Sequence, residues 1–225
     1  MQRFLMGISV VNRMIYPIAR YTFPPFYKLW LGKIEGMENI PKKGPFILAL
    51  NHSSFYDILL MYVLLIPKLD TPMHALVNSR YWNNRFSADF LDWGGGIPVY
   101  VGKDHDPKKN EVSLKKAESY LGQGHILQVF PEGTRSPDGT LKEGKLGIAR
   151  LAIRTGVPIV PVGVIDSHKV LPKGALFPRF IRARLKIGKP MIFTKQKKPS
   201  KKALEKTTRQ VMRKIAALIG QRYSH

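Results

Sequence analysis

The chain has 225 residues, of which 44% are hydrophobic, and it carries a formal net charge of +22 at pH 7 with no cysteine. This length and hydrophobic content suffice for one sizeable core and exclude disorder as the main state. The lack of cysteine excludes disulfides and thiolate metal sites. The positive charge points to an anionic partner, which can be nucleic acid, an anionic membrane surface or an anionic substrate.

The first 34 residues combine aliphatic, aromatic and basic side chains and contain no acid. Their aliphatic residues recur at roughly helical spacing, which is typical of a helix lying in a bilayer interface. The alternative is an N-terminal helix docked on its own domain. No run reaches the roughly 18 uncharged apolar residues that a membrane-spanning helix needs. We therefore expect residues 1–34 to form a membrane-associating helical segment, interfacial and not spanning, on the cytoplasmic face and attracted by anionic lipids.

From residue 35 onward, short apolar runs alternate with helical patterns, which predicts an α/β domain over residues 35–195. Several runs are apolar throughout, so we expect a mixed, largely parallel sheet flanked by helices. The expected strands are 46–50, 74–77, 97–101, 126–130, 159–164 and 181–187. The expected helices between them are 55–65, 79–91, 108–121 and 146–155. Residues 196–225 are expected to add a basic helix packed on this domain, with an amphipathic pattern over 201–221.

A histidine and a carboxylate follow the first of these strands, in the stretch Asn51-His52-Ser53-Ser54-Phe55-Tyr56-Asp57. Ligand sites in α/β folds cluster at such carboxyl ends of strands. If His52 lies in the loop and Asp57 in the first helical turn, the carboxylate can fix one ring nitrogen while the other takes a proton. Alternatively, Ser54 is an N-cap and Asp57 completes a capping box. This stretch alone leaves both interpretations open.

Two rival chemistries have less support. Ser53 and Ser54 adjoin His52, but the chain has no Gly-x-Ser-x-Gly nucleophile elbow. One histidine and one aspartate are too few ligands for a metal ion, and the remaining histidines show no ligand-like spacing. No metal site is therefore expected.

A second polar stretch, Phe130-Pro131-Glu132-Gly133-Thr134-Arg135-Ser136, follows the apolar run 126–130. Gly133 permits a positive φ or a close backbone approach. Arg135 offers a planar fork suited to phosphate, and Glu132 is placed to orient the arginine or accept from a substrate hydroxyl. The alternative is a glycine turn with an ordinary surface ion pair.

In this order the two stretches resemble the Asn-His-x4-Asp and Phe-Pro-Glu-Gly-Thr-x-Ser blocks of the glycerophospholipid acyltransferase family. Two weaker blocks, Gly96-Ile97-Pro98-Val99 and residues 157–162, are similar to the second and fourth motifs of that family. The family's second motif usually ends in an arginine that helps bind the acceptor phosphate. Val101 stands in that place here, and Lys103 follows two residues later. The resemblance covers about residues 35–190.

The resemblance implies an O-acyltransferase that moves a fatty acyl group directly from acyl-CoA or acyl-carrier protein to a hydroxyl of a lysophospholipid. The expected acceptor is 1-acylglycerol-3-phosphate, which would give phosphatidic acid; glycerol-3-phosphate, another lysophospholipid or an amino-acid lyso-lipid stay open. No cofactor is implied beyond the acyl donor as co-substrate. The resemblance makes His52 the catalytic base and Asp57 its partner. The substrate-binding residues that it implies are Asn51, Lys103, Glu132, Gly133, Thr134 and Arg135.

A basic nucleic-acid-binding protein is the non-enzyme alternative, because a charge of +22 invites it. Recognition needs a binding module as well as charge. The sequence contains no zinc-finger spacing, no aromatic RNP-like strand and no clear helix-turn-helix signature. No specific nucleic-acid partner is therefore expected.

Overall fold

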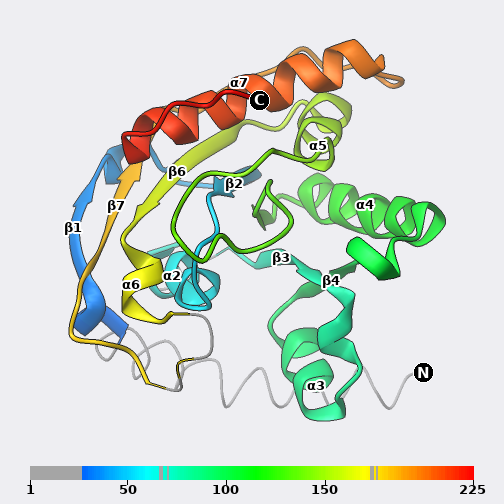
Figure 1. Cartoon of the computed structure of the whole chain (residues 1–225). Coiled ribbons are helices and arrows are strands. Elements are labelled where there is room, and N and C mark those ends of the chain that lie inside the picture. The colour runs from blue at the N-terminus through cyan, green and yellow to red at the C-terminus, as the bar shows by residue number, and fades with distance from the viewer. Residues whose placement is uncertain (1–26, 66–67, 70, 173–174, 176) are drawn as a thin grey trace.

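The protein is described by a computed structural model covering residues 27–65, 68–69, 71–172, 175 and 177–225. Its centre is a sheet of seven strands with helices on both faces (Figure 1). The strands are β1 (Leu31–Glu35), β2 (Phe46–Leu50), β3 (Met73–Asn78), β4 (Gly96–Val99), β5 (Ile126–Val129), β6 (Ile159–Ile165) and β7 (Ala183–Ile187). Their order across the sheet is β1-β7-β6-β2-β5-β3-β4.

All neighbouring strands of this sheet pair in parallel except β6 and β7, which are antiparallel. The helices are α2 (Tyr56–Leu65), α3 (Arg85–Trp93), α4 (Pro107–Gly122), α5 (Gly147–Thr155), α6 (Ser167–Val170) and α7 (Lys201–Ile219). The α/β class with a mixed, largely parallel sheet is confirmed.

The central strand β2 is apolar throughout because it is buried on both faces. Phe46, Leu48 and Leu50 belong to a core cluster that includes the inner side of α2. Ile47 and Ala49 belong to a second cluster, built with residues of α4, α5 and α7. The alternation of side chains along a strand distributes β2 between these two cores.

The register of β2 and β5 sets the position of the two polar stretches. These strands are parallel neighbours, and Ala49 lies opposite Val129. The chain segments that follow them therefore leave the sheet side by side at its carboxyl edge. This edge is where α/β proteins place their ligand sites.

Several elements differ from the sequence-based expectations. The expected helix 79–91 is a 3-10 helix, Ser79–Trp82, followed by α3, because the Asn84 side chain accepts the Ser87 N–H (3.2 Å) and starts a new helix. The last helix ends at Ile219, since Gly220 takes a left-handed conformation with φ 73°. The short helix α6 was not expected.

The N-terminal expectation is wrong for residues 31–34, which belong to β1 and pair with β7. A 3-10 helix, Lys28–Trp30, precedes that strand. Residues 1–26, which carry most of the expected interfacial helix, lie outside the described residues. None of the described helices is long and apolar enough to cross a membrane. The division of the chain at residue 196 stays a prediction.

Candidate functional site

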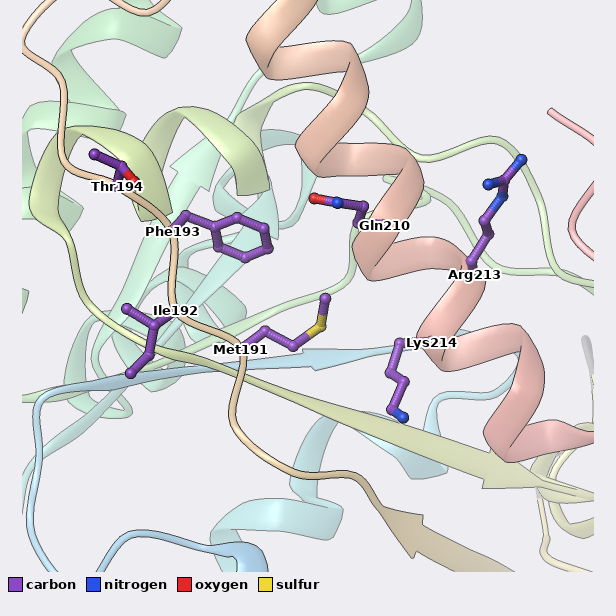
Figure 2. A pocket seen from close by; sticks show the side chains of 7 residues that line it. All are labelled: Met191, Ile192, Phe193, Thr194, Gln210, Arg213 and Lys214. Carbon is purple, nitrogen blue, oxygen red and sulfur yellow. The ribbon is translucent and has the colours of Figure 1, made fainter.

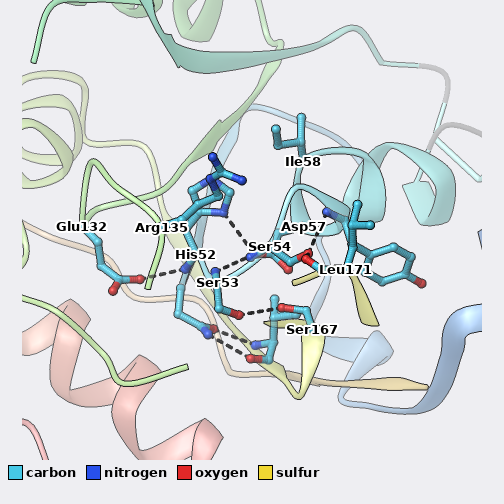
Figure 3. Close-up of polar contacts among 12 residues, drawn as sticks. His52, Ser53, Ser54, Asp57, Ile58, Glu132, Arg135, Ser167 and Leu171 are labelled. Atoms are coloured by element: carbon cyan, nitrogen blue, oxygen red, sulfur yellow. Dashed lines mark hydrogen bonds and ion pairs between the residues drawn. The ribbon is translucent and has the colours of Figure 1, made fainter. Parts of the chain in front are cut away.

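The loops after β2 and β5 meet at the carboxyl edge and place the two polar stretches in contact. Figure 3 shows the His52 loop between Asp57 at the start of α2 and Glu132 from the loop after β5. The backbone N–H of His52 donates to Glu132 Oε1 (2.7 Å), and the Ser136 N–H donates to the His52 carbonyl (2.8 Å). One site therefore unites motifs that are far apart in the sequence.

The centre of the site is a pair formed by His52 and Asp57. His52 Nδ1 lies 3.0 Å from Asp57 Oδ2, which also accepts the backbone N–H groups of Ser53 and Ser54 at 2.7 Å each. An oxygen that accepts two N–H groups is an acceptor toward the ring as well, so Nδ1 carries the proton and Nε2 keeps its lone pair. Asp57 is fully buried and the His52 side chain is 13% exposed. The geometry suits a general base with an orienting carboxylate.

One face of the His52 ring is also held in place by an aromatic neighbour. Phe130 stacks on it, with ring centroids 4.0 Å apart and planes inclined by 21°. This role of Phe130 was not predicted from the sequence, although the residue begins the second polar stretch. The contact of Nδ1 with Asp57 and the stacking of Phe130 together limit the orientations available to the His52 ring.

Glu132 holds two loops together. While Oε1 accepts from His52, Oε2 accepts the Lys142 backbone N–H (2.8 Å), and the carboxyl group is nearly fully buried. Burial raises the pKa of Glu132 to about 7, against the opposing effect of these two N–H donors and the Lys142 charge. These are positioning contacts; a direct contact of Glu132 with substrate stays a prediction. Lys142 carried no signal in the sequence.

Asn51 has a comparable structural engagement. Its Oδ1 accepts the Val164 N–H (2.7 Å) and its Nδ2 donates to the Val164 carbonyl (2.8 Å). The buried side chain thus extends the pairing of β2 with β6 by one residue, which fixes the start of the His52 loop. A contact of Asn51 with substrate also stays a prediction.

The two serines beside His52 are committed to packing contacts. Ser53 Oγ lies 2.7 Å from Ser167 Oγ of α6, and Ser54 Oγ donates to the Leu171 carbonyl (2.9 Å). Both serines are buried. These contacts give no support to a serine nucleophile at this site.

The turn after Glu132 presents a cation at the mouth of the site. Gly133 has φ 66°, the left-handed conformation that its sequence position predicts, and Gly133 and Thr134 are exposed. The Arg135 guanidinium lies over the Phe55 ring, 3.6 Å from its centroid. Lys142 Nζ donates to the Arg135 carbonyl (2.8 Å) and so fixes the backbone of the turn.

Lys103 lies apart from this hydrogen-bonded set, in a pocket of about 540 Å³ beyond the carboxyl ends of β3 and β4. Arg80 and Lys109 are the other strongly basic residues that line it. An edge-to-face contact between Phe55 and Tyr81, with centroids 6.2 Å apart, connects the Arg135 turn with the residue beside Arg80. The pocket and the His52 site therefore share one edge of the sheet.

A second pocket, of about 620 Å³, lies away from this chemistry. Figure 2 shows its lining residues, which are Met191, Ile192, Phe193, Thr194, Gln210, Arg213 and Lys214. Met191 bridges to Ile159, the first residue of β6, so this pocket belongs to the opposite, amino edge of the sheet. Its position excludes it as part of the His52 site.

Comparisons with known proteins agree with this geometry. A family model described as Acyltransferase matches residues 32–165. The chain is 34% identical over 162 residues to a chloroplastic 1-acyl-sn-glycerol-3-phosphate acyltransferase, LPAT1, of Arabidopsis thaliana, covering 70% of this chain and 41% of the relative. It is 28% identical over 160 residues to the 1-acyl-sn-glycerol-3-phosphate acyltransferase of Bacillus subtilis (strain 168), covering 71% and 73%. The chain thus spans less than half of the plant relative.

The fold is also similar to a solved structure, the crystal structure of the 1-acyl-sn-glycerophosphate (LPA) acyltransferase PlsC from Thermotoga maritima. The TM-score is 0.59 at 24% sequence identity, over 98% of this chain and 95% of the other. This likeness shows a shared fold.

Proposed function

Because the chain belongs to the acyltransferase family, whose model covers residues 32–165, we propose that it transfers a fatty acyl group to the free hydroxyl of 1-acylglycerol-3-phosphate. The product is phosphatidic acid. The observation that carries this proposal is the 3.0 Å contact of His52 Nδ1 with the buried Asp57 carboxylate, which leaves Nε2 to act as base. The names of the plant and bacterial relatives support the choice of acceptor.

The reaction proceeds in one transfer. His52 Nε2 removes the hydroxyl proton while the hydroxyl oxygen attacks the thioester carbonyl of acyl-CoA or acyl-carrier protein. The C–O bond forms, the C–S bond breaks, and the imidazolium returns the proton to the departing thiolate. Asp57 stabilises the imidazolium between these steps. No acyl-enzyme is needed, in keeping with the buried, hydrogen-bonded hydroxyls of Ser53 and Ser54.

Arg135, with the exposed backbone of Gly133 and Thr134, binds the acceptor phosphate in this proposal. A guanidinium held over an aromatic ring keeps its N–H groups directed outward in a fixed plane, which suits a phosphate. Lys103 supplies a second cation from the pocket on the same edge. Asn51 and Glu132 position the His52 loop, and Glu132 also positions the loop that carries Lys142.

The acceptor is a membrane lipid and the donor carries a fatty acyl chain, so the enzyme works at a membrane surface. We place it on the cytoplasmic face, held by the residues that precede β1 and by anionic lipids.

A direct assay tests the proposed function. The purified protein is given acyl-CoA or acyl-carrier protein together with 1-acylglycerol-3-phosphate, glycerol-3-phosphate, other lysophospholipids or an amino-acid lyso-lipid, and products are identified by mass spectrometry. We expect phosphatidic acid as the main product. Preferential acylation of another acceptor would overturn the assignment of the acceptor, and no acyl transfer to any of them would overturn the activity.

A further inference from the structure

We propose that exposed apolar side chains on two segments flanking the catalytic site dock the protein on an anionic lipid bilayer, in addition to any contact made by residues 1–26. We call these side chains the apolar rim; they are Phe86, Phe90, Phe177, Phe180 and Ile181. They make up five of the nine large apolar side chains that are exposed among the described residues. Phe180 is 102% exposed, Phe86 84% and Phe177 81%.

The first half of the rim lies beyond the carboxyl end of β6. The chain leaves that strand, forms α6 and passes through residues 171–182 before entering β7, where Arg184 lies opposite Ile165. The Ser54 hydroxyl, two residues from His52, donates to the Leu171 carbonyl at 2.9 Å. Leu171, which follows α6, therefore borders the catalytic loop directly.

The second half of the rim lies on α3, which follows the carboxyl end of β3. The intervening 3-10 helix carries Tyr81, which contacts Phe55 at the mouth of the site. In Figure 1, α3 and residues 177–182, which precede β7, both lie on the lower side of the molecule, whereas α7 lies on the upper side. The two halves thus stand on the same side of the protein, with the catalytic loop between them.

Basic residues neighbour Phe86 and Phe180, whereas the exposed Asp89 neighbours Phe90. Arg179 and Arg182 are exposed beside Phe180, and Arg85 is exposed beside Phe86. None of these three arginines forms an ion pair with a carboxylate of the described residues. Aromatic rings that enter the interface, with guanidinium groups at the level of lipid phosphates, are the combination that binds an anionic bilayer.

A bilayer fits this surface better than a protein partner does. The two halves belong to segments separated by the catalytic site, and a lipid surface contacts both at once while leaving the site open to its own lipids. This step rests on the proposed function, because the acceptor is itself a component of the bilayer. Large exposed apolar patches on a monomer mark an interaction site.

The lack of cysteine makes a direct test possible, since each introduced cysteine is the only one in the chain. The full-length variants Phe86→Cys and Phe180→Cys are labelled with an environment-sensitive fluorophore. Val112→Cys and Ile192→Cys are matched controls, because these side chains are 68% and 78% exposed but lie on α4 and at the amino edge. Vesicles contain phosphatidylcholine and phosphatidylglycerol, with or without a bilayer-embedded quencher.

At positions 86 and 180 we expect a blue shift and quenching from within the bilayer, and at 112 and 192 neither. The proposal fails if labels at 86 and 180 stay in a water-like environment on vesicle-bound protein. It also fails if all four labels respond alike, because that would indicate non-specific adsorption or aggregation of the protein. It fails as well if the protein does not bind the vesicles.

An activity readout separates this proposal from the proposed function. The double variant Phe86→Ser, Phe180→Ser should lose roughly tenfold or more in vesicle partitioning and in turnover of a bilayer-embedded acceptor. Its turnover of a short-chain, monomeric acceptor should equal that of the wild type. Equal loss on both acceptors would overturn the docking role. A protein inactive on both acceptors from the start, whose labels still report insertion, would instead overturn only the proposed function.

Discussion

The carboxylate of Asp57 takes part in two structures, the start of α2 and the pair with His52. Its Oδ2 accepts the N–H groups of Ser53 and Ser54, as an acidic residue in the first turn of a capped helix does, and it also contacts the imidazole. The sequence left capping and catalysis as alternatives. The structure makes them compatible, because the capped loop curves back and brings the ring to the same oxygen.

Substitutions at Asp57 should separate these two roles. Asp57→Asn keeps an oxygen for the helix start and for the ring, but it loses the negative charge that stabilises the imidazolium, so we expect turnover to fall by roughly 10²–10⁴-fold. Asp57→Ala should lose turnover and also about 1–2 kcal/mol of stability, because the cap is gone. Turnover assays and urea denaturation measure the two effects. Near-normal turnover of Asp57→Asn would contradict the assigned role.

The buried carboxyl of Glu132 should make stability depend on pH. Its pKa is raised from 4.5 to about 7 in the folded protein. The folded state therefore binds this proton more tightly than the unfolded state, and the resulting stabilisation is present below about pH 4.5 and lost as the pH rises through about 7. The unfolding free energy of the wild type relative to Glu132→Gln should fall across this range, by at most about 3 kcal/mol. A difference that does not change with pH would exclude the raised pKa.

Arg135 should act on the phosphate of the acceptor through its planar fork. Arg135→Lys keeps the charge but loses at least one charge-assisted hydrogen bond, worth about 1.5–3 kcal/mol. We expect KM for 1-acylglycerol-3-phosphate to rise by roughly tenfold or more, with little change for a neutral monoacylglycerol. Arg213→Lys, at the amino edge, is the control. An equal change for both acceptors would assign Arg135 to another part of the reaction.

At the scale of elements, the end of the chain supports the loop that carries the site. Gln221 Oε1 accepts the Leu141 N–H (2.8 Å), and its Nε2 donates to the Gly139 carbonyl (2.8 Å). The Tyr223 hydroxyl accepts the Gly144 N–H (3.1 Å). The loop between these contacts includes Lys142, whose N–H binds Glu132. The C-terminal residues are thus connected to the His52 loop through hydrogen bonds.

Gln221→Ala should loosen this loop without unfolding the sheet. Two hydrogen bonds are lost, each worth about 1 kcal/mol. We expect faster hydrogen exchange at the amides of Leu141 and Lys142 and reduced turnover, with unchanged exchange in β2 and β5. Arg222→Ala, an exposed neighbour, is the control. Unchanged exchange at Leu141 would show that the loop does not depend on the tail.

Elements with a strong periodic pattern could be predicted, and those defined by a single local contact could not. Apolar runs predicted β2, β5 and most of β6, because strands buried on both faces are apolar throughout. The break before α3 depends on the Asn84 side chain, and β1 on pairing with β7, which is distant in the sequence. An asparagine N-cap is too weak a local signal to outweigh the helical pattern over 79–91, and the pairing of β1 with β7 has no signature within a short window.

At the scale of the whole molecule, the sequence predicted the class of fold and the meeting of the two motifs, but not the division of labour within the site. Parallel strands bring His52 and Glu132 to one edge, as their positions after apolar runs indicate. Asn51 and Glu132 use their polar atoms to bind backbone groups of β6 and of the Lys142 loop. No local sequence pattern indicates that these segments come close to the two residues. Lys103 lies on the same edge but in a separate pocket.

The central claim is that His52 is the base of a direct acyl transfer, and turnover of His52→Ala tests it most directly. The His125→Ala variant, which removes a histidine at the amino edge of the sheet, is the matched control, and thermal unfolding verifies that both variants fold. Loss of a general base costs roughly 10²–10⁴-fold in rate, so we expect a loss of this size for His52→Ala and none for His125→Ala. Near wild-type turnover by a folded His52→Ala protein would contradict the account.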